Sequence, residues 1–295
     1  MRLRPGVLEC LAGPGAGLVD LVGVTPDGLA DLRGFWGRDG YRLEGVRLDR
    51  IDFSRADLTG WQFLDVSVHG CDFTGADLRD SRWFGTAVES SKFDRARLEG
   101  AALCTRSDEY PRQENSWVGC SFDRAKLKMT AFIGGIVQDC TFDDVRLAHV
   151  NFDGTRFVRT RFSGRLKEAI FDAPQDGDRF LDADGLDLRE AQLDDTMILR
   201  YRSTGILLPR TTRFAVLESP AKQIPKAIKK LGKREDLIAR QIRGILEDEL
   251  HSAYRPGQHV IINLDDVAEP GFDEQFRDVL ASVRARFLGP PTADR

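Results

Sequence analysis

The chain has 295 residues, of which 41% are hydrophobic and 31% charged, and its formal net charge is −4. This composition is typical of a soluble globular protein and excludes a disordered chain. No apolar run reaches the roughly 20 residues of a membrane-spanning helix. The five cysteines lack the spacing of a zinc site or a disulfide framework, so we expect a cytoplasmic protein with reduced thiols and no membrane association.

Residues 1–40 are expected to cap the structure that follows them. The segment 25–36 (TPDGLADLRGFW) is a candidate short helix. The glycines of Gly13–Gly17 lack the lysine and the strand–helix context of a phosphate-binding loop, so they are interpreted as an ordinary loop.

From Leu43 onward the chain has a repeat of five residues. Every fifth residue to Leu103 is large and apolar, and the same spacing resumes one residue out of phase at Phe122 and continues to Phe162. Small residues mostly stand two positions before each of these centres, and polar residues or Gly often follow. The predicted inward centres are Leu43, Leu48, Phe53, Leu58, Phe63, Val68, Phe73, Leu78, Trp83, Val88, Phe93, Leu98, Leu103, Phe122, Leu127, Phe132, Val137, Phe142, Leu147, Phe152, Phe157 and Phe162.

The repeat predicts a four-sided coil. Residues two apart on an extended chain share a face, so each pentapeptide supplies one short extended side and then a corner. Phe53, Phe73 and Phe93 recur every twenty residues, which makes four sides per coil. Successive coils would stack at about 4.8 Å, with like side chains in interior ladders.

The motif Ala-Asp-Leu at 56–58 and 76–78, with Cys-Asp-Phe at 71–73, resembles the pentapeptide-repeat family. The resemblance covers about residues 41–200 and implies a mainly β protein with a right-handed quadrilateral β-helix. It also implies a non-enzymatic interaction protein that forms a homodimer, with a protein partner and no cofactor.

Two breaks interrupt the five-residue count. Leu103 and Phe122 are nineteen positions apart instead of twenty, which we interpret as a loop at about 104–119. A second, irregular break is expected at about 163–187, with Phe171 as a candidate centre inside it. Leu188, Leu193 and Ile198 then predict a last turn before residue 200.

Residues 201–295 have a different pattern, that of an α-rich α/β extension. Helical spacing is expected from Ser219–Pro220 to Lys233, from Glu235 to Tyr254, and from Phe272 to Phe287. The run HVIINL (259–264) reads as a buried strand. The segment is interpreted as a small second domain or a dimerisation element.

Acidic residues flank many centres on the outer faces of the predicted coil. A stiff rod with regularly spaced carboxylates could imitate the phosphates of duplex DNA. Characterised members of the resembled family bind DNA gyrase in this way and protect it from quinolones, some through projecting loops, and the loop around Tyr110 would be the analogous feature here. Against this, Asp before the centre belongs to the repeat itself, and arginines interleave with the acids. The candidate residues are Asp52, Asp57, Asp72, Asp77, Asp94, Tyr110, Asp123 and Asp143.

A basic cluster marks the start of the extension. It could contact nucleic acid or an acidic partner, or it could be the solvated face of a helix. Direct nucleic-acid binding by the rod itself is not expected. The cluster consists of Lys222, Lys226, Lys229, Lys230, Lys233 and Arg234.

The sequence shows no catalytic or metal-binding constellation. The four histidines are scattered, and His69 and His149 fall on outward positions of the coil. Cys120 and Cys140 should stack as free core thiols. We therefore expect a rigid rod that binds a macromolecular partner, with DNA gyrase the specific candidate. The alternative is a scaffold or regulatory protein whose C-terminal region carries the partner or effector role.

Overall fold

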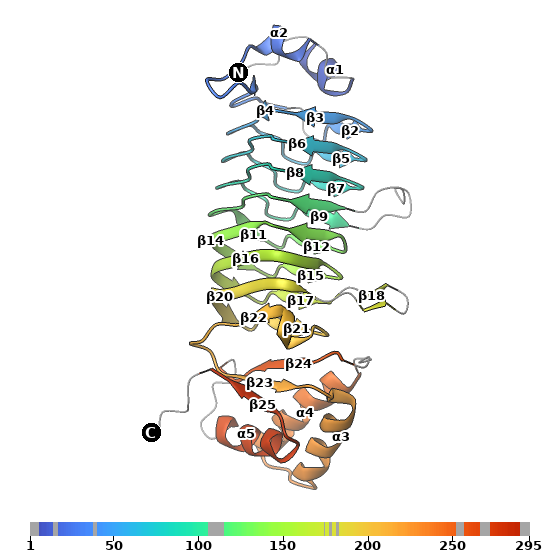
Figure 1. Cartoon of the computed structure of the whole chain (residues 1–295), viewed down its shortest axis with the longest axis vertical. Coiled ribbons are helices and arrows are strands. Elements are labelled where there is room, and N and C mark those ends of the chain that lie inside the picture. Colours follow the sequence, from blue (N-terminus) through green and yellow to red (C-terminus); the bar gives the residue numbers. More distant parts are fainter. Residues whose placement is uncertain are drawn as a thin grey trace.

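The computed structural model describes residues 6–13, 17–37, 40–105, 115–173, 175–176, 179–180, 183–251, 257–265 and 272–289. Its main body is an elongated stack of coils, with a small helical cap at the N-terminal end and a compact α/β unit at the other end (Figure 1). The body is the four-sided coil that the repeat predicted, a mainly β, right-handed β-helix as the family resemblance implied.

Each coil has four walls, and strands pair in parallel between successive coils. The first wall contains β2 (Arg42–Glu44), β5 (Gln62–Leu64), β7 (Arg82–Phe84), β9 (Ala102–Thr105), β12 (Ala131–Ile133), β15 (Asn151–Asp153), β17 (Ile170–Asp172) and β21 (Met197–Leu199). The second wall contains β3 (Arg47–Asp49), β6 (Ser67–His69), β8 (Ala87–Glu89), β10 (Ser116–Val118), β13 (Ile136–Gln138) and the start of β16 (Arg156–Lys167).

The third and fourth walls are named by their inward residues. The phenylalanine wall contains the stacked Phe53, Phe73, Phe93, Phe122, Phe142 and Phe162. The leucine wall contains the buried Leu58, Leu78, Leu98, Leu127, Leu147 and Leu166. Strands on these two walls are β4 (Ile51–Asp52), β11 (Lys126–Lys128), β14 (Thr141–Ala148), the rest of β16, and β20 (Asp184–Asp194).

All the predicted inward centres are buried, none more than 2% exposed. In the phenylalanine wall the rings lie nearly parallel in one column. Successive ring centroids from Phe53 to Phe162 are separated by 5.1, 4.8, 5.1, 4.5 and 4.3 Å. The strand spacing of about 4.8 Å sets this separation, because each ring sits on the same position of the next coil.

The first break is an insertion rather than a shortened coil. Val88 pairs with Trp117, and Trp117 with Val137, so this coil takes 29 residues from Val88 to Trp117 and then the twenty-residue register returns. Trp117 is itself a fully buried centre. The sequence analysis missed it, because the spacing from Leu103 to Phe122 was interpreted as one twenty-residue coil that lacks one residue.

The second break combines a deletion with an insertion. Phe142 pairs with Phe162, but Leu147 pairs with Leu166, one residue short of the repeat, and the shift falls at Gly164. Phe171 is buried and pairs with Phe152 and Ile198, as the sequence suggested. The short antiparallel pair β18 (Gln175–Asp176) and β19 (Arg179–Phe180) lies in the extra chain before β20.

The segment 25–36, predicted as a short helix, is instead a partial first coil, so that prediction is wrong. Its strand β1 (Ala30–Asp31) pairs in parallel with β4, and Leu32 and Phe35 are buried in the tube. The only helices in the described N-terminal residues are α1 (Val7–Leu11) and α2 (Leu18–Val22), which place Val7, Leu11 and Leu18 over the end of the core.

The C-terminal unit extends the first wall as an antiparallel sheet. After the short helix η1 (Ser203–Gly205), β22 (Ile206–Leu207) still pairs with β20. Then β24 (Val260–Asn263) pairs with β21, β23 (Phe214–Leu217) with β24, and β25 (Arg286–Leu288) with β23. The sequence analysis did not identify β23 or β25.

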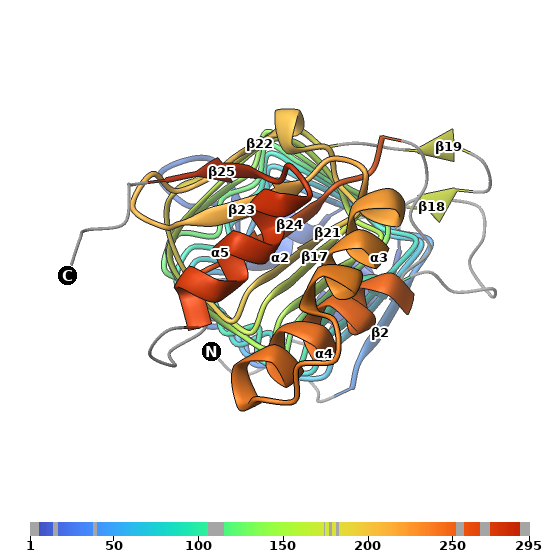
Figure 2. The same cartoon turned by 90° about the horizontal axis from the view of Figure 1, so that it is seen from below.

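Two cores meet in this C-terminal sheet. Phe214, Val216 and Ile261 face the end of the tube and belong to its core. Ala215, Leu217 and Val260 belong instead to a second core with α3 (Pro220–Leu231), α4 (Leu237–His251) and α5 (Phe272–Ser282). Figure 2 shows the three helices lying across the square outline of the coils. The tail thus closes the β-helix, whose last strand would otherwise present an unpaired edge.

Gly164 allows us to test how the ladder tolerates the one-residue deletion. A Cβ on Gly164 (φ +93°) would overlap the backbone N and O of Val145, whereas a Cβ on Gly45 (φ +64°) meets nothing within 4 Å. We expect Gly164→Ala to destabilise the protein by about 3 kcal/mol, and Gly45→Ala by only about 1 kcal/mol, since both carry the left-handed strain but only the first also clashes. Chemical denaturation measures both, and equal losses would contradict the close approach.

Candidate interaction surfaces

Four of the predicted acidic residues shape corners of the coil. The backbone N–H of Ser54 donates to Asp52 Oδ1 (2.8 Å), and that of Thr74 donates to Asp72 Oδ1 (2.8 Å). Asp57 and Asp77 accept the equivalent bonds from residues 59 and 79. Aspartate favours such turns because its short carboxylate reaches the backbone two residues ahead. The recurrence of these four residues therefore has a local structural cause.

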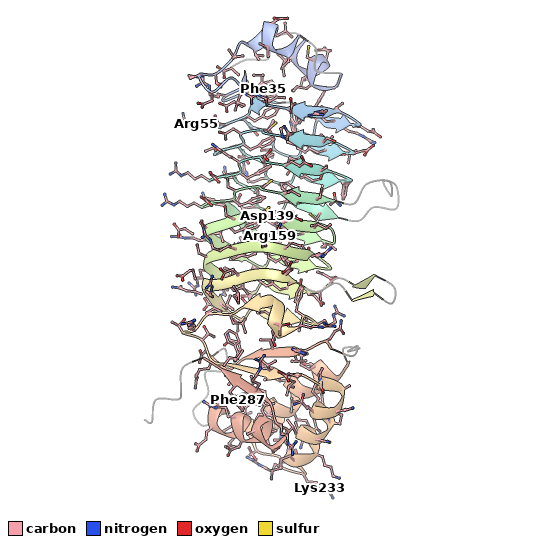
Figure 3. All side chains as sticks on the ribbon, in the orientation of Figure 1. Phe35, Arg55, Asp139, Arg159, Lys233 and Phe287 are labelled. Carbon is pink, nitrogen blue, oxygen red and sulfur yellow. The ribbon has the colours of Figure 1, made fainter. Side chains whose placement is uncertain are left out.

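Arginines neutralise part of this acidity. Asp77 receives Arg79 Nη2 at 2.7 Å and Arg97 Nη1 at 3.1 Å, and its pKa is lowered by these partners against the opposing effect of burial. Asp139 and Arg159 pair between neighbouring coils (2.7 Å, Figure 3). At these two places the outer surface of the rod therefore carries both charges side by side.

The remaining three predicted acids form a column on the phenylalanine wall. Asp94 Oδ1 accepts the backbone N–H of Asp123 (3.1 Å), and Asp123 Oδ1 accepts the hydroxyl of Thr141 (3.3 Å). Asp143 pairs with Arg161 (2.5 Å). Burial, and then the charges of Asp94 and Asp143, raise the pKa of Asp123. We call Asp94, Asp123 and Asp143 the acidic column.

Tyr110 and the loop tip around it fall in 106–114, outside the described residues.

The basic cluster of the tail lies on α3 and in the turn after it. Ile224, Ala227 and Leu231 form the buried face of α3, and Lys222, Lys226, Lys229, Lys230 and Lys233 are all exposed. Arg234 pairs with Asp236 (2.9 Å). Lys233 lies at the far end of the molecule in Figure 3.

Cys120 and Cys140 stack as predicted, with the backbone N–H of Cys120 donating to Cys140 Sγ (3.4 Å). The described histidines and cysteines form no shared cluster. His69 contacts Asp49 (2.9 Å) and His149 contacts Glu168 (2.6 Å), both on the outer surface. All five cysteines are free, and burial raises the pKa of Cys71 to about 12. Among the described residues, no group of three or more His, Cys, Asp or Glu side chains could hold a metal ion.

One hollow is found in the C-terminal unit. It has a volume of about 220 Å³ and is bordered by Arg213, Phe214, Leu264, Arg277 and Phe287, among others. Arg277 lies 5.0 Å above the Phe287 ring, and Arg213 pairs with Asp265 (2.6 Å). The hollow is smaller than the roughly 300–1,000 Å³ usual for small-molecule sites, and we assign it no ligand.

The chain forms a β-helical rod with polar outer walls and a C-terminal α/β unit. Residues 42–80 and 125–164 match the family model of the pentapeptide repeats, in eight copies. These two segments of the rod therefore consist of pentapeptide repeats. No helix in the described residues is long and apolar enough to cross a membrane.

Solved structures with matching segments are distant. Full-length QnrB1, a plasmid-mediated fluoroquinolone resistance protein, is 18% identical, with a TM-score of 0.24 over 54% of this chain and 85% of its own. A pentapeptide repeat protein from the Arabidopsis thaliana thylakoid lumen is 21% identical, with a TM-score of 0.27 over 47% and 75%.

HetL, involved in heterocyst differentiation regulation in the cyanobacterium Nostoc sp. strain PCC 7120, is 16% identical, with a TM-score of 0.18 over 60% and 87%. No curated protein matches the sequence. Scores this low carry no information about function.

The acidic column should reduce stability at neutral pH. Because the folded protein raises the pKa of Asp123 above its ordinary value of 3.8, the folded state binds the proton more tightly than the unfolded chain, and stability falls as pH rises through that window. We expect Asp123→Asn to stabilise the protein at pH 7 by about 0.2–1 kcal/mol, with the gain disappearing below about pH 4.

Denaturation of both proteins at pH 7 and pH 3.5 measures this difference. Asp143→Asn is the matched control, since it loses the Arg161 pair and should not stabilise. A destabilised Asp123→Asn protein at pH 7 would show that the three carboxylates do not repel one another.

Proposed function

We propose that the protein is a non-enzymatic interaction module that acts in the cytoplasm, where its buried free thiols stay reduced. The proposal rests on one observation: the inward residues of the repeat form the core, and the outward residues form the surface. Every centre is used for packing, and what remains is a set of flat walls whose polar side chains are held at fixed strand spacing. Such a surface can recognise a macromolecule by its charge pattern.

DNA gyrase is the specific partner that we propose, and the acidic column supports it. Asp94, Asp123 and Asp143 stack on successive coils of the phenylalanine wall, and of these three only Asp143 is paired with a described arginine. Asp52 and Asp72 also stack on this wall, but both bond the backbone of their own corners. A line of anions on a rigid rod suits a groove that normally holds duplex phosphates.

A gyrase supercoiling assay with the purified protein tests this proposal. We expect an effect at micromolar concentration, and Asp94→Asn with Asp123→Asn should raise the concentration needed about tenfold, or ~1.4 kcal/mol. The control replaces Asp80 and Asp153, exposed acids on other walls. No effect of the wild type, or equal loss with the control pair, would rule out mimicry by the acidic column.

The alternative assigns the partner to the C-terminal unit, and the exposed lysines of α3 favour it. Removing the unit is a poor test, because the antiparallel pairing of β24 with β21 covers the end of the rod. Substituting Lys226 and Lys229 leaves that cover intact. Affinity purification from the native host should retain the same partners with this variant if the rod carries the function, and lose them if α3 does.

The homodimer implied by the family resemblance stays a prediction. A second copy cannot add to the rod at β21, since β24 already occupies that edge. Any dimer would therefore use another surface.

A further inference from the structure

The outer surface of the leucine wall is strongly basic over four successive coils. The residues on either side of Leu98, Leu127, Leu147 and Leu166 point outward, which gives eight positions. Six of the eight are cationic, one is Ala148, and Glu99 is the one acid. This concentration of positive charge occurs in a protein whose net charge is −4. We call the six cations the basic wall: Arg97, Lys126, Lys128, Arg146, Arg165 and Lys167.

The ladder register stacks these cations directly. Arg97 pairs with Lys126, Lys126 with Arg146, and Arg146 with Arg165. At about 4.8 Å per coil, this column is about 14 Å long. Lys128 and Lys167 flank Ala148 in a parallel column two residues away.

The cations in the middle of the wall have no partner in the part of the chain that the structure describes. Lys126, Lys128 and Arg146 are exposed and form no ion pair with a described residue. The ends are better compensated: Arg97 pairs with Asp77 (3.1 Å) and Lys167 with Glu168 (3.2 Å). Like charges on directly neighbouring strands cost stability, so the fold itself does not account for the central cations.

The neighbours of these cations favour one kind of partner. The eight outward positions hold no aromatic and no large apolar side chain. Protein–protein interfaces depend on such buried anchors, and single-stranded nucleic acids need aromatic rings to stack on. Binding to duplex phosphates needs only cations at suitable spacing, because its free energy comes from released counterions. A duplex carries one charge per about 1.7 Å, so about 8 charges span the column and roughly half of them face it.

We propose that the basic wall binds the phosphate backbone of duplex DNA without reading its sequence. This departs from the expectation that the rod makes no direct contact with nucleic acid. The site is distinct from the acidic column on the phenylalanine wall. The test below contains no gyrase, so its outcome is independent of the gyrase proposal.

Fluorescence anisotropy of a labelled 24-base-pair duplex, titrated with the full chain, tests the proposal. With about four phosphate contacts, raising the salt from 50 to 200 mM should weaken binding about 10²-fold. Lys126→Gln with Arg146→Gln should lower the slope of log Kd against log salt by about 2, because each lost contact removes about one counterion. Both residues are exposed and unpaired in the described structure, so the double variant should fold normally.

The matched control is Lys226→Gln with Lys229→Gln on α3, which makes the same charge change on exposed tail residues and should leave the slope unchanged. Loss of binding with the tail variant but not the wall variant would overturn the proposal, as would no binding of the wild type at 50 mM salt and 100 µM protein. Tighter binding to polyglutamate, or to vesicles rich in phosphatidylserine, would also overturn it and assign the wall to an acidic protein or a membrane surface.

Discussion

The parallel hydrogen-bond ladder between coils is the constraint on which this structure depends. The backbone N–H groups of Phe53, Phe73 and Phe93 each donate at 2.7 Å to a carbonyl of the following coil. Because every such bond fixes equivalent residues one above another, a side chain must pack against its own counterpart in the next coil. Columns of like residues result, with Phe on Phe in one wall and Leu on Leu in another.

Irregularities are absorbed where the ladder allows them. The pairing of Val88 with Trp117, and of Trp117 with Val137, continues in register although extra residues stand between β9 and β10. A missing residue is harder to absorb, because it shortens a wall. The single deletion falls at Gly164, whose left-handed backbone passes against the backbone of Val145. A looped insertion costs little closure entropy, whereas a deletion needs a residue without a side chain.

The buried centres of the coil could be predicted from the sequence, because they recur every five residues and depend on local spacing alone. The sequence missed features whose cause is not local. Trp117 follows an insertion that hides its period, and β23 is a strand because β24, far along the chain, pairs with it. Residues 25–36 look helical in isolation, yet Ala30 and Asp31 pair with residues of the next coil, twenty-one positions ahead. Tertiary pairing outweighs local propensity in these segments.

Charges flanking the centres were visible in the sequence, but they could not be assigned to walls across the insertion. Arg97 and Lys126 become neighbours only when the coil between them is counted as 29 residues.

An outward charged residue indicates a function only where the fold itself does not explain its presence. Asp52 and Asp72 bond the backbone two residues ahead, so the corner geometry is enough to explain an aspartate at that point in the repeat. The side chains of Lys126, Lys128 and Arg146 form no ion pair with a described residue, and Lys126 and Arg146 repel each other on adjacent coils. Because aspartates form the corners of the repeat, the chain can have a negative net charge without having an acidic surface that binds a partner. Cations that the repeat does not need, gathered on one wall, require a reason outside the fold, and an anionic partner supplies it.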